Sequence, residues 1–283
     1  MLIQLDHVKK EYEDFTLELD MHMPENRVTG LIGANGAGKS TTFKLMLGLI
    51  RPDAGDVKVF EKKAGELSAE DRQKIGTVFS DSGLSEYLTV QQVGRIMQEF
   101  YSDFEPEQFY RRCEYFHIPQ KKKIKEFSTG MKAKLKILLA VSHDSRLLIL
   151  DEPTAGLDVI AREEILDILR GYMEVPGRSV VLSSHISGDL EHFCDDLYMI
   201  DKGKIVLHEE TDRIMEEYGL LKMSEQEFTG LDKEYLLRVR KESFGYSCLT
   251  DQRVYYLENY PMIVNEKGNI DEVIAMLVKG ERI

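Results

Sequence analysis

A glycine-rich stretch near the N-terminus carries the first residues whose type and spacing could do chemistry. Gly33-Ala-Asn-Gly-Ala-Gly-Lys39-Ser40 matches the pattern G-x-x-x-x-G-K-[ST], whose glycines let backbone N–H groups turn inward around phosphate oxygens. Lys39 supplies a positive charge for the outer phosphates, and the Ser40 hydroxyl is a ligand for Mg²⁺. A glycine-rich turn before an ordinary helix would explain the glycines but not the Lys-Ser pair. The candidate nucleotide-binding residues are Asn35, Gly36, Ala37, Gly38, Lys39, Ser40 and Thr41.

Two acids, Asp151 and Glu152, follow the apolar run at residues 147–150. The carboxyl ends of the strands in an α/β sheet are where ligands bind. We therefore expect Asp151 to face Mg²⁺, mostly through water, and Glu152 to act as the general base for an attacking water. Acids after a strand are also common as caps or turn formers, so this pair alone leaves both interpretations open.

The elements that must position these residues are strands and helices in alternation. Phe15–Met23 alternates apolar and polar residues with period 2, typical of a half-buried strand at an antiparallel edge. A short apolar run at residues 28–32 precedes the glycine-rich stretch, and a helix follows it. The compact apolar runs at 147–150 and 179–182 fit strands of a parallel sheet, joined by a crossover helix over 161–173. Residues from about 81 to 143 favour helix.

With these motifs in order, the chain resembles an ABC ATPase over roughly residues 1–215. Residues 127–131, FSTGM, resemble the family's LSGGQ signature and keep Ser128 and Gly130, while Thr129 and Met131 replace the usual Gly and Gln. Ser128 also fits the N-cap of the following helix, which would form a second anion site. In the family, this segment binds the γ-phosphate held by the other subunit.

Three further positions follow from the resemblance. Asp158 ends a match to the D-loop, and His185 occupies the place of the switch histidine, which would contact the γ-phosphate or the attacking water. Tyr12 falls where the family places an aromatic residue that stacks on adenine. A lone His or Tyr is more often a packing residue. Ser80 replaces the family's usual Gln, and its shorter side chain puts direct contact with Mg²⁺ in doubt. The adjacent Asp81 could compensate.

The resemblance implies a P-loop NTPase core of α/β class with a mainly parallel sheet, an N-terminal antiparallel β subdomain and an inserted helical subdomain at about 81–143. After residue 215 the motifs are complete, and residues 216–283 are expected to form a small α+β appendage. We expect a helix over 211–218, a strand-like alternation at 254–257 and a final helix over 270–278.

Bulk properties restrict the functional class. The chain has 283 residues and a formal net charge of -13, which argues against a nucleic-acid-binding protein. Its three cysteines are widely spaced, so neither a disulfide framework nor a zinc site is indicated. No apolar run approaches the roughly 20 residues of a membrane-spanning helix, and the N-terminus does not resemble a signal peptide. We expect a cytoplasmic protein.

The leading hypothesis is the ATP-hydrolysing motor of a transporter, using ATP and Mg²⁺, with a second ABC ATPase subunit and a separate transmembrane permease as partners. The basic run Lys121-Lys-Lys-Ile-Lys125 is most simply a solvated face, but with the FSTGM signature it resembles subunits paired with ABC-2-type permeases, often exporters. The alternatives are a soluble ABC ATPase of translation or DNA maintenance, and an inactive nucleotide-binding regulator. The latter would lack Lys39, Glu152 or His185, and all three are present.

Overall fold

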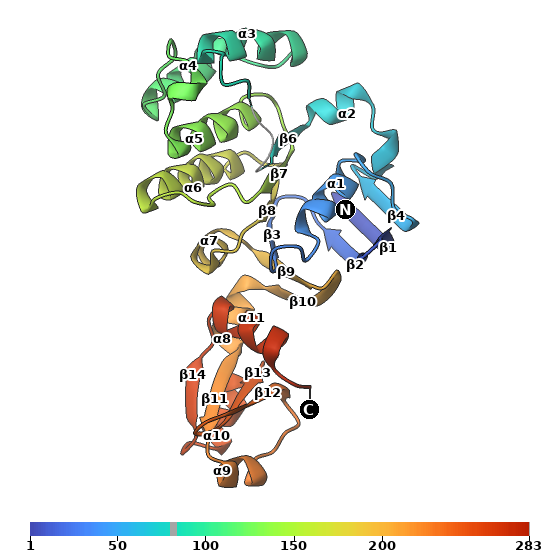
Figure 1. Cartoon of the computed structure of the whole chain (residues 1–283), viewed down its shortest axis with the longest axis vertical. Coiled ribbons are helices and arrows are strands. Elements are labelled where there is room, and N and C mark those ends of the chain that lie inside the picture. The colour runs from blue at the N-terminus through green and yellow to red at the C-terminus, as the bar shows by residue number, and fades with distance from the viewer. Residues whose placement is uncertain (80–83, 283) are drawn as a thin grey trace.

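A computed structural model of the chain describes residues 1–79 and 84–282. Ser80 and Asp81 lie outside these ranges, so their proposed roles stay predictions. The chain forms one large mixed sheet flanked by helices and a smaller sheet near the C-terminus (Figure 1). The helices α3 and α4 lie at one end of the molecule and the smaller sheet lies at the other.

The large sheet has ten strands in the order β5-β4-β1-β2-β10-β9-β3-β8-β7-β6. Neighbouring strands are parallel through β9, β3, β8, β7 and β6, whereas β1, β2, β4 and β5 are antiparallel. This matches the expected parallel core with an antiparallel N-terminal part. The strands are β1 Ile3–Tyr12, β2 Phe15–Met23, β3 Val28–Ile32, β4 Ala54–Val59, β5 Lys62–Lys63, β6 Ile75–Val78, β7 Leu147–Asp151, β8 Ser179–Ser183, β9 Asp196–Asp201 and β10 Lys204–Glu210.

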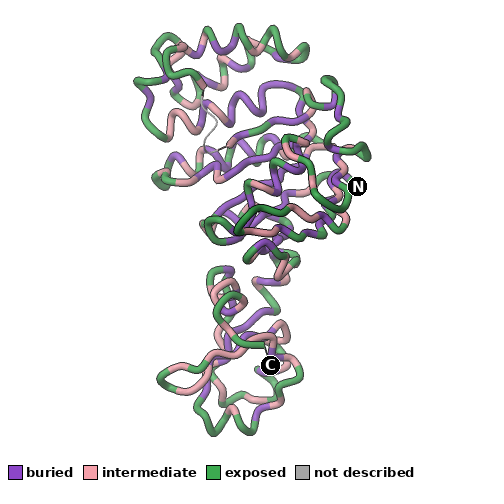
Figure 2. The backbone as a smooth tube through the Cα atoms, turned by 45° about the vertical axis from the view of Figure 1, so that its right-hand side comes forward, coloured by how far each residue is buried: buried purple, intermediate pink, exposed green. Residues whose placement is uncertain are grey.

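The parallel strands are covered on both faces. In β7, Leu147 and Ile149 belong to one apolar cluster, while Leu148 and Leu150 belong to another. Successive side chains of a strand point to opposite faces, so a strand buried on both sides appears as a continuous apolar run. Buried residues accordingly run through the central part of the molecule that holds these strands (Figure 2).

Helices surround the sheet and fill the segment between β6 and β7, as the sequence predicts. The crossover helix α6 begins two residues earlier than expected, because Asp158 caps it by accepting a hydrogen bond of 2.9 Å from the Ala161 N–H. The helices up to β9 are α1 Lys39–Met46, η1 Ala64–Glu66, α2 Ala69–Gln73, α3 Val90–Phe100, α4 Pro106–Tyr115, η2 Ile124–Glu126, α5 Thr129–Ala140, α6 Val159–Met173 and α7 Ser187–Phe193.

The smaller sheet has the order β12-β13-β11-β14 and is antiparallel throughout. The expected helices at 211–218 and 270–278 are present as α8 and α11. The remaining elements are α8 Thr211–Glu217, β11 Gly219–Met223, α9 Glu225–Gly230, β12 Leu236–Glu242, β13 Gly245–Thr250, α10 Arg253–Asn259, β14 Val264–Lys267 and α11 Ile270–Lys279.

The prediction of a strand from the alternation at 254–257 is wrong, because this segment lies within helix α10. Its aromatic and β-branched residues favour strand by propensity, but tertiary packing overrides that preference. Tyr256 is buried and its hydroxyl donates to the Asp232 carbonyl at 2.9 Å, while Tyr260, four residues on, has its ring 5.9 Å from that of Tyr256. That spacing is the helical one.

Candidate nucleotide-binding and hydrolysis site

The glycine-rich loop connects β3 to α1, as its motif requires. A Cβ at Gly33 would lie 2.3 Å from the Ile200 carbonyl oxygen, so only glycine fits there. Gly38 has φ of 119° immediately before the first residue of α1, a conformation open to glycine alone. The backbone N–H groups of the loop and the positive N-terminal end of the helix therefore lie together and form an anion-binding site.

Lys39 is held inside this loop. Its side chain is only 7% exposed, and its ammonium donates a hydrogen bond of 2.6 Å to the Gly33 carbonyl. The same nitrogen lies 3.4 Å from Glu152 Oε1. A buried cation at the start of a helix with no acidic residue in its first turn is a fixed positive charge for phosphate.

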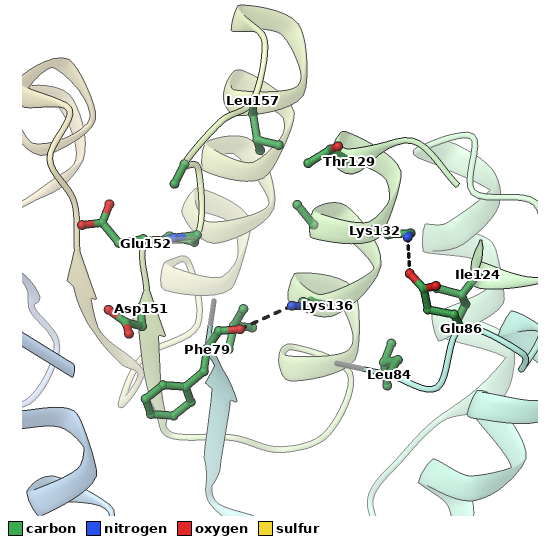
Figure 3. Close-up of a pocket in the computed structure, with 14 residues that line it drawn as sticks. Phe79, Leu84, Glu86, Ile124, Thr129, Lys132, Lys136, Asp151, Glu152 and Leu157 are labelled. Carbon is green, nitrogen blue, oxygen red and sulfur yellow. Dashed lines mark hydrogen bonds and ion pairs between the residues drawn. The ribbon is translucent and has the colours of Figure 1, made fainter. Parts of the chain in front are cut away.

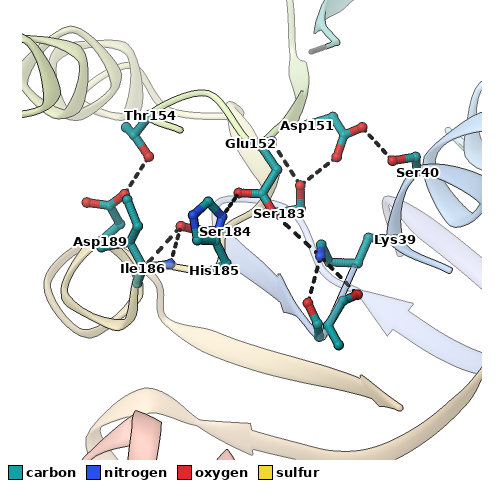
Figure 4. Close-up of polar contacts among 12 residues, drawn as sticks. Lys39, Ser40, Asp151, Glu152, Thr154, Ser183, Ser184, His185, Ile186 and Asp189 are labelled. Carbon is teal, nitrogen blue, oxygen red and sulfur yellow. Dashed lines mark hydrogen bonds and ion pairs between the residues drawn. The ribbon is translucent and has the colours of Figure 1, made fainter. Parts of the chain in front are cut away.

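A chain of hydroxyl and carboxylate groups joins the loop to the sheet. The Ser40 hydroxyl donates to Asp151 Oδ2 at 2.6 Å, and the Ser183 hydroxyl donates to Asp151 Oδ1 at 2.7 Å. Ser183 Oγ also accepts the Glu152 N–H at 2.9 Å. Asp151 and Ser183 are partners in the β7–β8 register, which places Ser183 beside both acids (Figure 4).

These oxygens fit a magnesium ion. Mg²⁺ prefers oxygen ligands, keeps several waters and uses one or two protein groups together with substrate phosphates. Ser40 Oγ and the Asp151 carboxylate supply such a pair. Within residues 1–79 and 84–282, no cluster of three or more His, Cys, Asp or Glu side chains could hold a metal ion.

Glu152 occupies the centre of the site in a strained conformation. Its φ of 52° lies in the left-handed region, which is uncommon for residues other than glycine and clusters at functional sites. Oε2 lies 2.6 Å from His185 Nδ1. Oε1 is buried and has no hydrogen-bond partner among the described residues, with Lys39 as its ionic neighbour. The carboxylate is thus oriented by His185 and retains one oxygen for a proton.

A cavity of about 530 Å³ opens over these groups. Tyr12 lies on its wall with 48% of its surface exposed, so an aromatic face is available there. Phe15 and Lys44 also line the cavity, and sequence reasoning missed both. Tyr12 and Phe15 are paired across the two-residue turn between β1 and β2, with ring centroids 6.4 Å apart. Recognising that short turn would have placed Phe15 beside Tyr12.

The signature residues lie elsewhere. Ser128 caps α5 by accepting the Met131 N–H at 3.2 Å, as the sequence predicts. A Cβ at Gly130 would lie 3.0 Å from Ala161 Cβ, so close packing of α5 on α6 already explains that glycine. In the described part of the chain, none of Ser128, Thr129, Gly130 and Met131 lines the cavity around Lys39.

A second hollow, of about 320 Å³, separates α5 from the carboxylates of Asp151 and Glu152. Thr129 and Leu157 lie at one side of it, and Asp151 and Glu152 lie at the other (Figure 3). Lys136 donates to the Phe79 carbonyl at 3.3 Å, which connects α5 to the end of β6. The helical segment is therefore tied to the sheet directly beside the site.

The three cysteines take no part in this chemistry. Cys113, Cys194 and Cys248 are all buried and unpaired. Burial raises the pKa of the Cys113 and Cys248 thiols to about 12 and also raises the pKa of Cys194. Protonated, enclosed thiols are poor nucleophiles.

The fold and this site define a nucleoside-triphosphate-binding protein with a phosphate loop on a parallel sheet. The model of the family described as ABC transporter matches residues 17–155. The lantibiotic transport ATP-binding protein SrtF of Streptococcus pyogenes is 34% identical over 217 residues, covering 75% of this chain and 92% of SrtF. The linearmycin resistance ATP-binding protein LnrL of Bacillus subtilis is 30% identical over 246 residues, covering 84% and 79%.

A solved ATP-binding subunit of an ABC transporter superposes with a TM-score of 0.68 at 26% identity, covering 76% of this chain and 92% of that subunit. The chain belongs to the ABC transporter family as an ATP-binding subunit, and it is an ATPase. Over the residues that the structure describes, no helix has the length and apolar character to cross a bilayer.

Proposed function

We propose that this chain powers export through a separate membrane permease, by closing face to face with a second ABC ATPase subunit when ATP is bound. The observation that carries the proposal is the separation of the two halves of the site. Lys39, Ser40, Asp151 and Glu152 line one cavity, and His185 contacts Glu152 beside it. The capped helix start at Ser128 lies outside that cavity. A second chain facing the first would supply that helix start to the γ-phosphate.

In the proposed mechanism, the loop N–H groups and the Lys39 ammonium hold the outer phosphates. Tyr12 and Phe15 offer aromatic surface to the adenine ring of ATP. Ser40 and Asp151 would hold Mg²⁺, which neutralises charge that develops on the phosphates. The oxygen of a water molecule attacks the γ-phosphorus, the bond to the ADP oxygen breaks, and Glu152 accepts the proton of the water. His185 keeps the Glu152 carboxylate oriented through their 2.6 Å contact.

The names of the relatives support the direction of transport. SrtF is named for lantibiotic transport and LnrL for linearmycin resistance, and both functions fit removal of a compound from a cell. The proposed location is the inner face of the cell membrane, through contact with the permease. In this reading residues 1–215 form the ATPase domain, with its helical subdomain at about 81–143, and residues 216–283 form an accessory segment.

Complementation between two inactive variants tests the facing arrangement. Lys39→Ala removes the phosphate-binding amine and leaves the signature intact, whereas Ser128→Arg blocks the signature and leaves the loop intact. A mixture of the two should hydrolyse ATP, because mixed pairs contain one complete composite site. If each variant is inactive alone and the mixture is equally inactive, the face-to-face arrangement is wrong. Wild type mixed with each variant is the control for pairing.

A further inference from the structure

His185 lies between two elements: strand β8 ends two residues before it and helix α7 begins two residues after it. Ser184, on the other side of His185, is fully buried, and its Oγ accepts the Ile186 N–H at 3.0 Å. Only Ile186 separates His185 from Ser187, the first residue of α7, and the turn at Ile186 restricts the motion of His185 relative to the helix. A shift of α7 is therefore passed directly to His185.

On its inner face, α7 is anchored to the segment that carries the proposed general base. Asp189 is fully buried, and its carboxylate accepts a hydrogen bond of 2.5 Å from Thr154 Oγ1 (Figure 4). It accepts another from Arg162 Nε. Thr154 lies two residues after Glu152, and Arg162 lies in α6. A Cβ at Gly188 would lie 2.9 Å from Arg162 Nη2, so this glycine leaves room for the guanidinium to cross α7.

On its outer face, α7 is held by the C-terminal helix. The Ser187 hydroxyl donates to Asp271 Oδ2 at 2.8 Å, and Glu191 Oε1 accepts the Ile270 N–H at 3.3 Å. Leu190 of α7 and the α11 residues Ile270, Val273 and Met276 are buried in the same apolar cluster. Both hydrogen bonds involve residues in the first turn of α11, so this turn holds α7 at Ser187 and at Glu191.

We propose that the C-terminal segment positions His185 for hydrolysis by holding α7, with Asp189 and Asp271 as positioning residues on opposite sides of that helix. The inference rests on the proposed role of His185 beside Glu152. With both anchors in place, α7 keeps the imidazole 2.6 Å from the carboxylate. Releasing the α11 contact lets α7 shift, so the imidazole leaves Glu152 for part of the time and the rate of the chemical step falls.

The test uses the full-length chain with Ser187→Ala, Asp271→Ala and the double variant. Ser187 and Asp271 form an exposed contact, so neither change leaves a buried group unpaired. The turnover number kcat should fall about 2- to 10-fold in each single variant, the range expected when one hydrogen bond is lost. KM for ATP should not change, because the phosphate loop is untouched. The double variant should behave like either single variant, since both remove one interaction.

Glu272→Ala is the matched control, because it removes a carboxylate from the same turn of α11. Glu272 forms its hydrogen bonds with Asn269 and not with α7. Its kcat should equal that of the wild type. The same variants are then placed on His185→Ala, where they should have no further effect.

Unchanged or higher kcat in the single variants, additive losses in the double variant, or further losses on His185→Ala would each overturn the positioning role. If His185→Ala itself hydrolyses ATP at the wild-type rate, the proposed function of His185 falls, and this inference falls with it. A normal loss in His185→Ala together with unaffected Ser187 and Asp271 variants overturns the inference alone.

Discussion

The Lys39 ammonium lies 3.4 Å from Glu152 Oε1, so the residue proposed to hold phosphate and the residue proposed to accept a proton form an ion pair. A γ-phosphate carries more negative charge than one carboxylate and competes for the same amine. Nucleotide binding would therefore draw Lys39 toward the phosphates and free the Glu152 oxygen for water. We therefore expect nucleotide binding to precede activation of Glu152, because both steps depend on Lys39.

Glu152→Gln should bind ATP and hydrolyse it about 10²- to 10⁴-fold more slowly, the usual contribution of a general base. The amide keeps the shape of the side chain but cannot accept the proton. ATP affinity should stay at or above the wild-type level, because the amide no longer competes for Lys39. Gel filtration of this variant with saturating ATP should show a dimer. Wild-type turnover in Glu152→Gln would mean that another group is the base.

Lys39→Ala should weaken ATP binding at least about tenfold, because charge-assisted hydrogen bonds to phosphate contribute roughly 1.5–3 kcal/mol. Equilibrium titration with Mg-ATP measures the change. Lys44→Ala is the control, since Lys44 lines the same cavity but is exposed and lies one turn along α1. Equal losses in both variants would show that general charge, rather than the buried Lys39, determines affinity.

Asp189→Ala should lower the free energy of unfolding by about 3–5 kcal/mol, the range found when one partner of a buried ion pair is removed. Arg162 and Thr154 would each lose the carboxylate that they contact. Urea denaturation monitored by far-UV circular dichroism gives the change in midpoint. Asp167→Ala removes an exposed partner of Arg170 and should cost less than about 1 kcal/mol. Similar midpoints for the two variants would contradict the importance of the buried anchor.

Acid stability should depend on Asp71. The Lys62 ammonium and the hydroxyl and N–H of Ser68 lower the pKa of Asp71 from 3.8 to about 2. Because the folded state holds this proton less tightly than the unfolded state, the stabilisation is complete above about pH 4 and is lost as the pH falls to about 2. Asp71→Asn should therefore lose less stability than the wild type over this interval.

Denaturation midpoints measured between pH 4 and pH 2 test this, with Asp103→Asn as a control at an exposed acid. If Asp71→Asn follows the wild-type pH dependence throughout, the interaction with Lys62 does not stabilise the fold.

The sequence revealed those parts of the site whose chemistry is contiguous along the chain. The glycine-rich loop and the Asp151-Glu152 pair each depend on neighbouring residues, and the structure brings both to one cavity. The contact of Ser183 with Asp151 cannot be predicted from local sequence, because it depends on the register between two separate strands. The sequence at the end of a buried strand is the same whether its serine forms a hydrogen bond with a carboxylate or with the backbone.

Two other outcomes have the same origin in tertiary structure. The local sequence of α10 favours a strand, whereas the burial of Tyr256 that stabilises the helix depends on the neighbouring sheet. The anchor at Asp189 was missed because its partners, Thr154 and Arg162, lie 35 and 27 residues away in sequence. Only the folded chain brings the three together.

The apolar cluster that contains Leu190 and Ile214 continues without interruption into Ile270 and Met276. Each such buried side chain contributes roughly 1.5–3 kcal/mol, and these contributions are shared between the ATPase core and the C-terminal segment. The C-terminal segment also has a separate cluster that includes Leu221, Cys248 and Tyr256, but the shared cluster couples its folding to that of the ATPase core. Heating should thus melt both parts in one calorimetric transition. A C-terminal segment grafted from a relative would fit only if the recipient's α7 presented a matching surface.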